Sequence, residues 1–269
     1  MSVPTRSAAV ALGLLASVSA SAEVEGRVVE YRDGETVLEG YLAYDTKGPA
    51  KRPGVLVVHD WTGVGPYVRR RADELAAMGY VAFAADVYGK GVRPANPKEA
   101  SATASVYRND RRLFRSRVRA ALAELRKQPN VLPGSIAAIG FCFGGTAVIE
   151  LARSGADVLG VVSFHGGLDS PTPSDGKNIR ARVLVLHGAD DPFVPEDKVR
   201  AFEEEMRQGG VDWQLVKYGG AVHSFTIPDA GSDNSKGAAY NAAADRRSWK
   251  AMQDFFAEIF AGAAPGAPR

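Results

Sequence analysis

The sequence predicts an α/β fold with a mostly parallel, twisted sheet, helices on both faces and an N-terminal antiparallel hairpin. Short apolar runs such as Val55–Val58 are typical of strands covered on both faces. They alternate with segments of helical period, which predicts parallel strands joined by helices. Two strands near the start are separated only by the turn Asp33-Gly34-Glu35 and are expected to pair as a hairpin. No repeat or linker divides the chain, so we expect one domain over residues 23–269.

Each element follows from its local pattern. Apolar and β-branched runs predict strands over Val28–Tyr31, Val37–Tyr44, Val55–Val58, Val81–Ala84, Ile136–Ile139, Leu159–Phe164, Val183–Leu186 and Trp213–Tyr218. Apolar residues three, four or seven apart predict helices over Val68–Met78, Ala100–Gln128, Thr146–Ser154, Asp197–Gln208 and Tyr240–Phe260. The segment Ala100–Gln128 is expected to be one long helix. Small residues and prolines in Ala261–Arg269 predict a disordered tail.

Composition and the first residues indicate the compartment of the protein and exclude some classes of partner. With 33 Lys and Arg against 31 Asp and Glu, the formal charge is +2, which gives no overall field for gripping nucleic acid. Arg6, the apolar run Ala8–Ala16 and the terminal Ala20-Ser21-Ala22 have the layout of a secretory signal peptide over residues 1–22. We therefore expect an exported protein, periplasmic or secreted. No later apolar stretch is long enough to predict stable membrane association after cleavage.

The single cysteine lies at a turn with a specific sequence. The expected strand Ile136–Ile139 runs into Gly140-Phe141-Cys142-Phe143-Gly144-Gly145 and then into a helix. A G-x-C-x-G-G sequence between strand and helix is typical of a nucleophile elbow, whose glycines relieve crowding around a strained residue. The helix dipole at this position favours a thiolate. Cys142 is therefore the candidate nucleophile, and a buried, unreactive cysteine is the structural alternative.

A thiol nucleophile needs a base and an acid to orient that base. In hydrolases with such an elbow the chain order is nucleophile, acid, base, with the base after the last strand. Of the four histidines only His223 satisfies this order, while those that end strands are expected to cap backbone groups: His59, His165 and His187. Two aspartates compete as the acid, and Asp191, which precedes Pro192, is favoured over Asp190.

Other features supply the remaining expectations. The backbone N–H groups of Phe143 and Trp61 are candidates for an oxyanion hole. Neither a metal-ligand motif nor a Walker pattern is found, so no cofactor, no metal and no nucleotide is expected. The run Arg69-Arg70-Arg71 is expected to be solvated. Six more arginines on one predicted helix suggest a solvated face or else a surface that steers anions or binds a partner: Arg108, Arg111, Arg112, Arg115, Arg117 and Arg119.

These residues resemble the dienelactone hydrolase family of the α/β-hydrolase fold over nearly all of the chain after residue 22. The resemblance rests on Val57–Gly63, Asp86-Val87-Tyr88, Gly140–Gly145, Asp191–Pro195 and His223-Ser224-Phe225. It implies a Cys-Asp-His triad at Cys142, Asp191 and His223. Family members place an acidic residue, usually glutamate, where this chain has Asp60, and there it holds the resting thiol. Relatives that act on dienelactone have an arginine where this chain has Ile227, whose side chain cannot pair with an anion.

The sequence thus predicts a cofactor-free hydrolase that cleaves a small-molecule ester or lactone through a cysteine thioester. We expect a monomer. Two other functions stay open at this point. Cys142 could instead be a redox-active thiol, although the chain has no second cysteine to resolve a disulfide. The chain could also be a non-catalytic binding module on a hydrolase fold.

Overall fold

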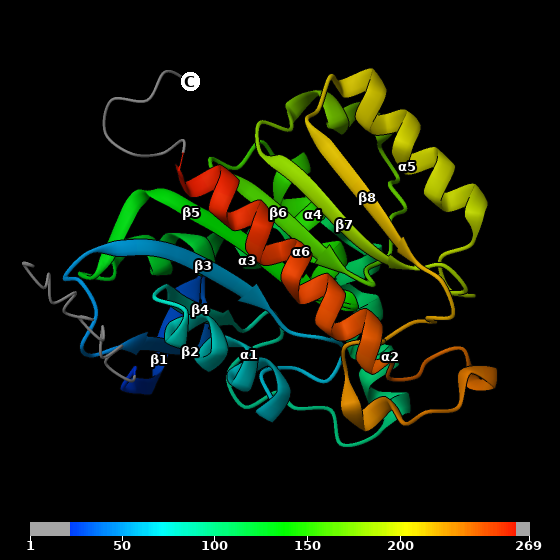
Figure 1. Cartoon of the computed structure of the whole chain (residues 1–269). Coiled ribbons are helices and arrows are strands. Elements are labelled where there is room, and N and C mark those ends of the chain that lie inside the picture. The colour runs from blue at the N-terminus through cyan, green and yellow to red at the C-terminus, as the bar shows by residue number, and fades with distance from the viewer. Residues whose placement is uncertain (1–21, 262–269) are drawn as a thin grey trace, which may run out of the picture.

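The strands of the chain form one sheet, which a computed structural model describes for residues 22–261. In chain order the strands are β1 Val24–Asp33, β2 Thr36–Asp45, β3 Arg52–Val58, β4 Val81–Ala85, β5 Val131–Phe141, β6 Gly160–Phe164, β7 Arg182–Gly188 and β8 Trp213–Tyr218. Their order across the sheet is β1-β2-β4-β3-β5-β6-β7-β8. The hairpin β1–β2 is antiparallel, β2 joins β4 antiparallel, and every later pair is parallel (Figure 1). The predicted α/β fold with an N-terminal hairpin is confirmed.

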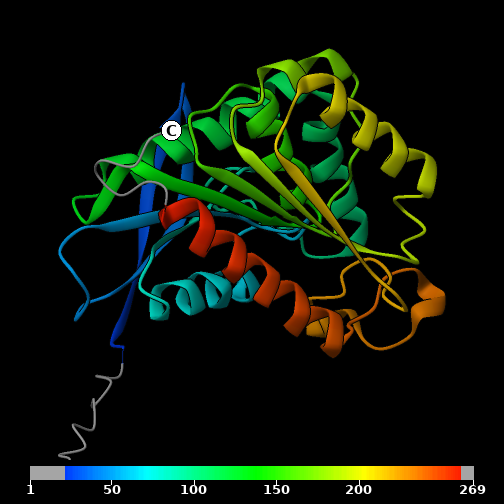
Figure 2. The same cartoon turned by 45° about the horizontal axis from the view of Figure 1, so that its top comes forward.

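Helices cover both faces of the sheet, as Figure 2 shows. They are α1 Pro66–Ala77, α2 Pro97–Asn109, α3 Arg111–Lys127, α4 Phe143–Arg153, α5 Glu196–Gly209 and α6 Ala242–Ala261. Helices α1 and α6 bury apolar side chains such as Leu75 and Phe256 on one face. Helices α3, α4 and α5 bury Val118, Leu151 and Phe202 on the other. The sheet therefore lies between two apolar cores. The carboxyl ends of its parallel strands are where a site is expected to form.

The prediction of one long helix over Ala100–Gln128 is wrong, because the structure has two helices there. Helix α2 ends at Asn109 and α3 begins at Arg111. Asp110 between them has φ −116° and ψ 86°, and its carboxylate accepts a hydrogen bond from the Leu113 N–H. Aspartate is a favoured N-cap residue, and this cap competes with a continuous helix. The apolar stripe still faces the core, since Tyr107 of α2 and Phe114 of α3 are both buried.

Two expectations fall at the chain ends. The predicted signal peptide over 1–22 lies, apart from its last residue, outside the described residues, as does most of the predicted disordered tail. Between residues 22 and 261 the structure contains no helix that is both long and apolar enough to span a bilayer.

Candidate active site

The turn between β5 and α4 has the geometry of a nucleophile elbow. Cys142 connects the two elements with φ 54° and ψ −111°, a backbone conformation that residues other than glycine rarely adopt. A Cβ atom on Gly140 would lie 2.0 Å from the Gly144 carbonyl oxygen, and one on Gly144 would lie 2.1 Å from the Val58 carbonyl oxygen. Only glycine fits at either position. The turn thus places the thiol beyond the sheet edge, at the first turn of α4.

The thiol contacts one of the predicted partners directly. The Sγ atom of Cys142 lies 3.0 Å from Nε2 of His223, in the loop that follows β8. The other ring nitrogen, Nδ1, lies 2.8 Å from Oδ2 of Asp191, in the loop that follows β7. Three residues from three different loops therefore form a continuous chain of contacts from carboxylate to thiol. This is the arrangement in which an imidazole can exchange a proton with a thiol while a carboxylate fixes its orientation.

Of the two competing aspartates, only Asp191 contacts His223. Its side chain is completely buried, and its second oxygen accepts a hydrogen bond of 2.8 Å from the Phe193 N–H. Asp190 is exposed and accepts a hydrogen bond from the Gly220 N–H at 3.1 Å. The hydrogen bond from Phe193 stabilises the charged, correctly oriented form of the Asp191 carboxylate.

Electrostatics at His223 favour its charged form. Burial alone lowers the pKa of this imidazole, but the negative charge of the Cys142 sulfur and the hydrogen bond to Asp191 outweigh it and raise the pKa from 6.5 to about 10. With both ring nitrogens protonated, Nε2 donates to the sulfur and Nδ1 donates to Asp191. A charged imidazole next to the sulfur stabilises a thiolate, the form in which sulfur is nucleophilic.

The other histidines contact backbone groups or lack a partner. Nδ1 of His165 accepts a hydrogen bond of 3.1 Å from the Cys142 N–H, and its Nε2 lies 2.7 Å from the Thr226 hydroxyl oxygen. Nε2 of His59 accepts from the Val87 N–H at 3.2 Å. His187 has a buried Nδ1 without a hydrogen-bond partner among the described residues. The contact of His165 with the elbow itself was not predicted, because strand-end position gives no signal of which loop lies opposite.

The two residues proposed for an oxyanion hole adjoin Cys142 in the chain or line its cavity. Phe143 follows Cys142 at the first position of α4, and Trp61 lines the same cavity as the thiol. Neither the Phe143 N–H nor the Trp61 N–H donates a hydrogen bond to any residue in the range 22–261. The Tyr88 hydroxyl donates at 3.0 Å to the Trp61 carbonyl oxygen, which belongs to the peptide after the one that carries the Trp61 N–H. Two free donors next to a nucleophile could hold a developing oxyanion.

Asp60, the residue at the family's thiol-holding position, has other partners. One of its carboxylate oxygens accepts from the Thr62 N–H at 2.7 Å and from the Thr62 hydroxyl at 2.6 Å. The Cys142 sulfur contacts His223 instead. In this arrangement Asp60 stabilises the loop that carries Trp61, and the structure does not bring its carboxylate to the thiol.

A cavity of about 550 Å³ opens over the thiol. The side chains of Trp61, Phe193 and Val194 give it apolar walls, and Ile227 does not line it. Its cationic residues are Arg108, Arg111 and Lys236, against Asp169 as a carboxylate. Asp169 lies in the segment between β6 and β7, and Lys236 lies in the segment between β8 and α6. This size is typical of pockets for small organic molecules.

The run Arg69-Arg70-Arg71 is not uniformly solvated, which corrects the sequence-based expectation. Arg71 is buried, and its Nη2 donates to Oδ1 of Asp245 on α6 at 2.6 Å. Its Nε also donates to the Tyr67 hydroxyl, which contacts the Thr226 hydroxyl at 2.7 Å. Thr226 in turn contacts His165, which accepts from the Cys142 N–H. Arg71 is therefore linked to the elbow through Tyr67, Thr226 and His165.

The chain is similar to known proteins over most of its length. The model of the dienelactone hydrolase family matches residues 38–260. The chain belongs to the dienelactone hydrolase family. A solved dienelactone hydrolase-like promiscuous phosphotriesterase from metagenomic libraries is 42% identical, with a TM-score of 0.83, over 88% of this chain and 98% of that one. Membership of the family makes the chain a hydrolase of carboxylic esters or lactones.

Two further relatives lie at greater distance. A carboxymethylenebutenolidase homolog from Mus musculus is 28% identical over 71% of this chain and 78% of its own length. The dienelactone hydrolase from Anabaena variabilis is 23% identical, with a TM-score of 0.62, over 86% of this chain and 98% of that one. At that identity the second likeness shows the fold alone.

Proposed function

We propose that the protein hydrolyses a small carboxylic ester or lactone through a thioester on Cys142. The thiolate attacks the carbonyl carbon, and the resulting tetrahedral oxyanion is held by the N–H groups of Phe143 and Trp61. As the intermediate collapses, the carbon–oxygen bond to the leaving group breaks and His223 gives its proton to the leaving alkoxide. Water then attacks the thioester, His223 takes a proton from that water, and the carboxylic acid leaves with the cysteine restored.

The observation that carries this proposal is the contact chain Asp191–His223–Cys142 at the base of a cavity. The sulfur-to-nitrogen distance of 3.0 Å allows direct proton exchange. The strained backbone of Cys142 supports the same role, because such strain is kept where a side chain must be presented to a reactant. The Asp191 carboxylate orients and stabilises the imidazolium, and it does not take the proton itself.

The test is a comparison of wild type with Cys142→Ala and Cys142→Ser on a panel of activated esters, thioesters and lactones. We expect wild type to turn over at least one substrate class and Cys142→Ala to lose that turnover by a factor of about 10³ or more. Mass spectrometry of wild type quenched during turnover should detect an acyl adduct on the peptide that contains Cys142. Full activity in Cys142→Ala, or an adduct on another residue, would overturn the assignment.

We also propose that the protein is exported and that residues 1–22 are removed. The support is the charged, apolar and small-residue order of that segment. Expression of the full chain in a Gram-negative host, followed by fractionation and N-terminal mass analysis, tests this. A periplasmic product beginning at Glu23 is expected. A cytoplasmic product that retains the first residues after Met1 would contradict export.

A further inference from the structure

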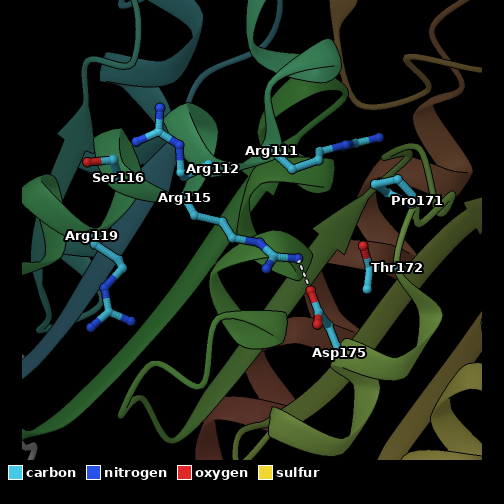
Figure 3. A pocket seen from close by; sticks show the side chains of 8 residues that line it. All are labelled: Arg111, Arg112, Arg115, Ser116, Arg119, Pro171, Thr172 and Asp175. Atoms are coloured by element: carbon cyan, nitrogen blue, oxygen red, sulfur yellow. Dashed lines mark ion pairs between the residues drawn. The ribbon is translucent and has the colours of Figure 1, made fainter.

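A second cavity lies beside the catalytic one, on the outer surface of α3. Its volume is about 480 Å³, and four arginines of α3 line it against the segment that contains Thr172 and Asp175 (Figure 3). These arginines are Arg111, Arg112, Arg115 and Arg119. Only Arg111 also lines the catalytic cavity, so the two spaces are neighbours but not the same site.

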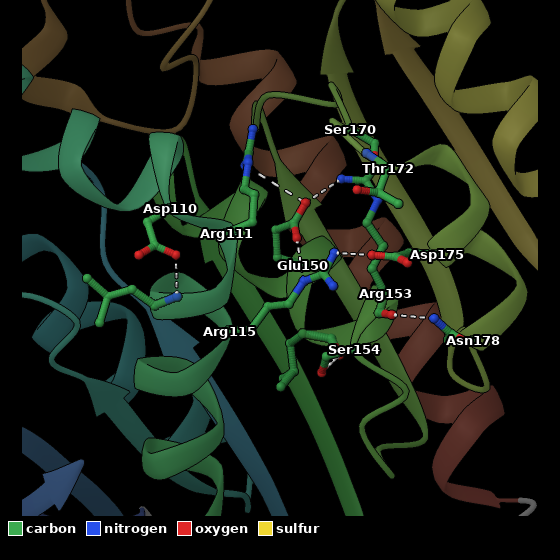
Figure 4. Close-up of polar contacts among 12 residues, drawn as sticks. Asp110, Arg111, Arg115, Glu150, Arg153, Ser154, Ser170, Thr172, Asp175 and Asn178 are labelled. Carbon is green, nitrogen blue, oxygen red and sulfur yellow. Dashed lines mark hydrogen bonds and ion pairs between the residues drawn. The ribbon is translucent and has the colours of Figure 1, made fainter. Parts of the chain in front are cut away.

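Two of these arginines are neutralised by fixed carboxylates. Arg115 donates from Nε to Glu150 at 2.7 Å and pairs through Nη2 with Asp175 at 2.7 Å. Arg111 pairs through Nη2 with Asp169 at 2.6 Å. Glu150 is fully buried and also holds Arg153 of its own helix, as the centre of Figure 4 shows. Arg153 also pairs with buried Glu205 at 2.6 Å, so the carboxylates of this network fully neutralise its arginines and fix the floor of the cavity.

The remaining two arginines carry charge that no carboxylate within residues 22–261 balances. Arg112 is exposed and makes neither a hydrogen bond nor an ion pair with any residue in the described part of the chain. Arg119 is exposed, and among the residues that the structure describes it donates only to the carbonyl and hydroxyl oxygens of Ser154, at 3.3 and 3.2 Å. Seven residues separate them, so they lie two turns apart on one helix face, with Arg115 between them. The rim of the cavity therefore presents two separated, unneutralised guanidinium groups.

We propose that this cavity is a binding site for a small molecule that carries two or more anionic oxygen groups. Guanidinium groups hold such oxygens with paired, charge-assisted hydrogen bonds. The cavity is large enough for an organic polyanion, and the spacing of Arg112 and Arg119 suits two charged groups better than one. The Thr172 side chain on the opposite wall can add a neutral hydrogen bond. Polycarboxylates and linked phosphates share this chemistry.

Calorimetric titration of the full chain with citrate and, separately, with pyrophosphate tests the site, with sodium chloride holding the ionic strength constant. Arg112→Ala/Arg119→Ala removes the two free cations. Arg126→Ala/Arg207→Ala removes the same charge from surface ion pairs elsewhere, on α3 and α5. We expect wild type and the control pair to bind at least one probe equally. The Arg112→Ala/Arg119→Ala variant should bind it about tenfold more weakly or worse, with ester hydrolysis unchanged.

Three results would overturn the proposal. One is the absence of binding of both probes to wild type. Another is an equal loss of binding in both double variants, which would indicate a general effect of net charge. The third is binding that survives in Arg112→Ala/Arg119→Ala but is lost in Arg108→Ala, which would place the anion in the catalytic cavity. A response to citrate alone or to pyrophosphate alone supports the site and identifies which anionic group it prefers.

Discussion

His223 and His165 both contact Cys142, yet they do opposite things. His223 faces the sulfur and is held by the carboxylate of Asp191, and its pKa is raised to about 10. His165 faces the backbone N–H of the same residue, and its other nitrogen meets a hydroxyl group. Burial, together with the charge of nearby His223, holds the pKa of His165 well below its usual value. The two rings lie 5.4 Å apart, centroid to centroid.

The difference lies in the partner and not in the depth of burial. A carboxylate on one side and a thiolate on the other stabilise an imidazolium, whereas an N–H donor requires a neutral ring with a free lone pair. Because Nδ1 of His165 accepts, its proton is on Nε2 and is donated to Thr226. The neutral histidine therefore fixes the strained elbow, and the charged one is placed to do the chemistry.

The largest difference in activity is expected between the asparagine variants of His223 and His165. His223→Asn should lower kcat/KM for an activated ester by a factor of about 10³ or more, because the proton carrier is lost. His165→Asn keeps an acceptor and tolerates the positive φ of 41° at that position, so most activity should remain. Initial rates, with circular dichroism to check folding, measure both. Equal losses in the two variants would contradict the division of roles.

Asp191→Asn should cause a loss of activity nearly as large as that of His223→Asn. The amide cannot stabilise the imidazolium, so we expect a loss of about 10³-fold in kcat with a smaller change in KM. The matched control is Asp190→Asn. The Asp190 carboxylate is exposed and accepts a hydrogen bond from the Gly220 N–H, away from His223, so the activity of this variant should stay close to that of wild type. A larger loss in the Asp190 variant would reverse the choice of acid.

A smaller effect is expected from removing the acceptor at residue 165 altogether. His165→Ala leaves the buried Thr226 hydroxyl with one partner fewer and places alanine at positive φ, so stability should fall by about 1–3 kcal/mol. The kcat should fall about tenfold as the elbow loosens, while the pH profile keeps its shape, because a neutral His165 does not titrate in the working range. Urea unfolding and pH–rate measurements on His165→Ala and His165→Asn test this. A displaced pH profile would show that His165 titrates during catalysis.

The smallest expected effect concerns the pKa of His223 and is measured by titration. NMR should find the His223 ring still charged at neutral pH in wild type, with its pKa near 10. In Cys142→Ala that pKa should fall, because the thiolate charge is gone. A raised folded-state pKa contributes stability that is complete below pH 6.5 and is lost as the pH rises through about 10. Wild type should therefore lose more unfolding free energy than Cys142→Ala across that interval, and equal losses would contradict the ion pair.

Local sequence patterns determined much of this protein. Apolar β-branched runs and helical periods predicted the α/β fold, because burial on both faces of a parallel sheet leaves that signature. The glycines around Cys142 predicted the elbow, since any side chain at Gly140 or Gly144 would meet backbone atoms. Chain order singled out His223 among the histidines, and Pro192 favoured Asp191 over Asp190. The structure places His223 against the thiol and Asp191 against His223. The break at Asp110 was missed, although aspartate as a capping residue is a local signal.

Only the tertiary structure decided the contacts between distant loops. Arg71 reads as one member of a solvated basic run, but its partner Asp245 lies 174 residues away. His165 meets the elbow through the pairing of β5 with β6, and the split of α3 arginines into neutralised and free groups depends on Glu150, Asp169 and Asp175. The physical reason is the same in each case. Residue type sets what a side chain can bind, whereas its actual partner, and with it its charge state, is set by which segments the sheet brings together.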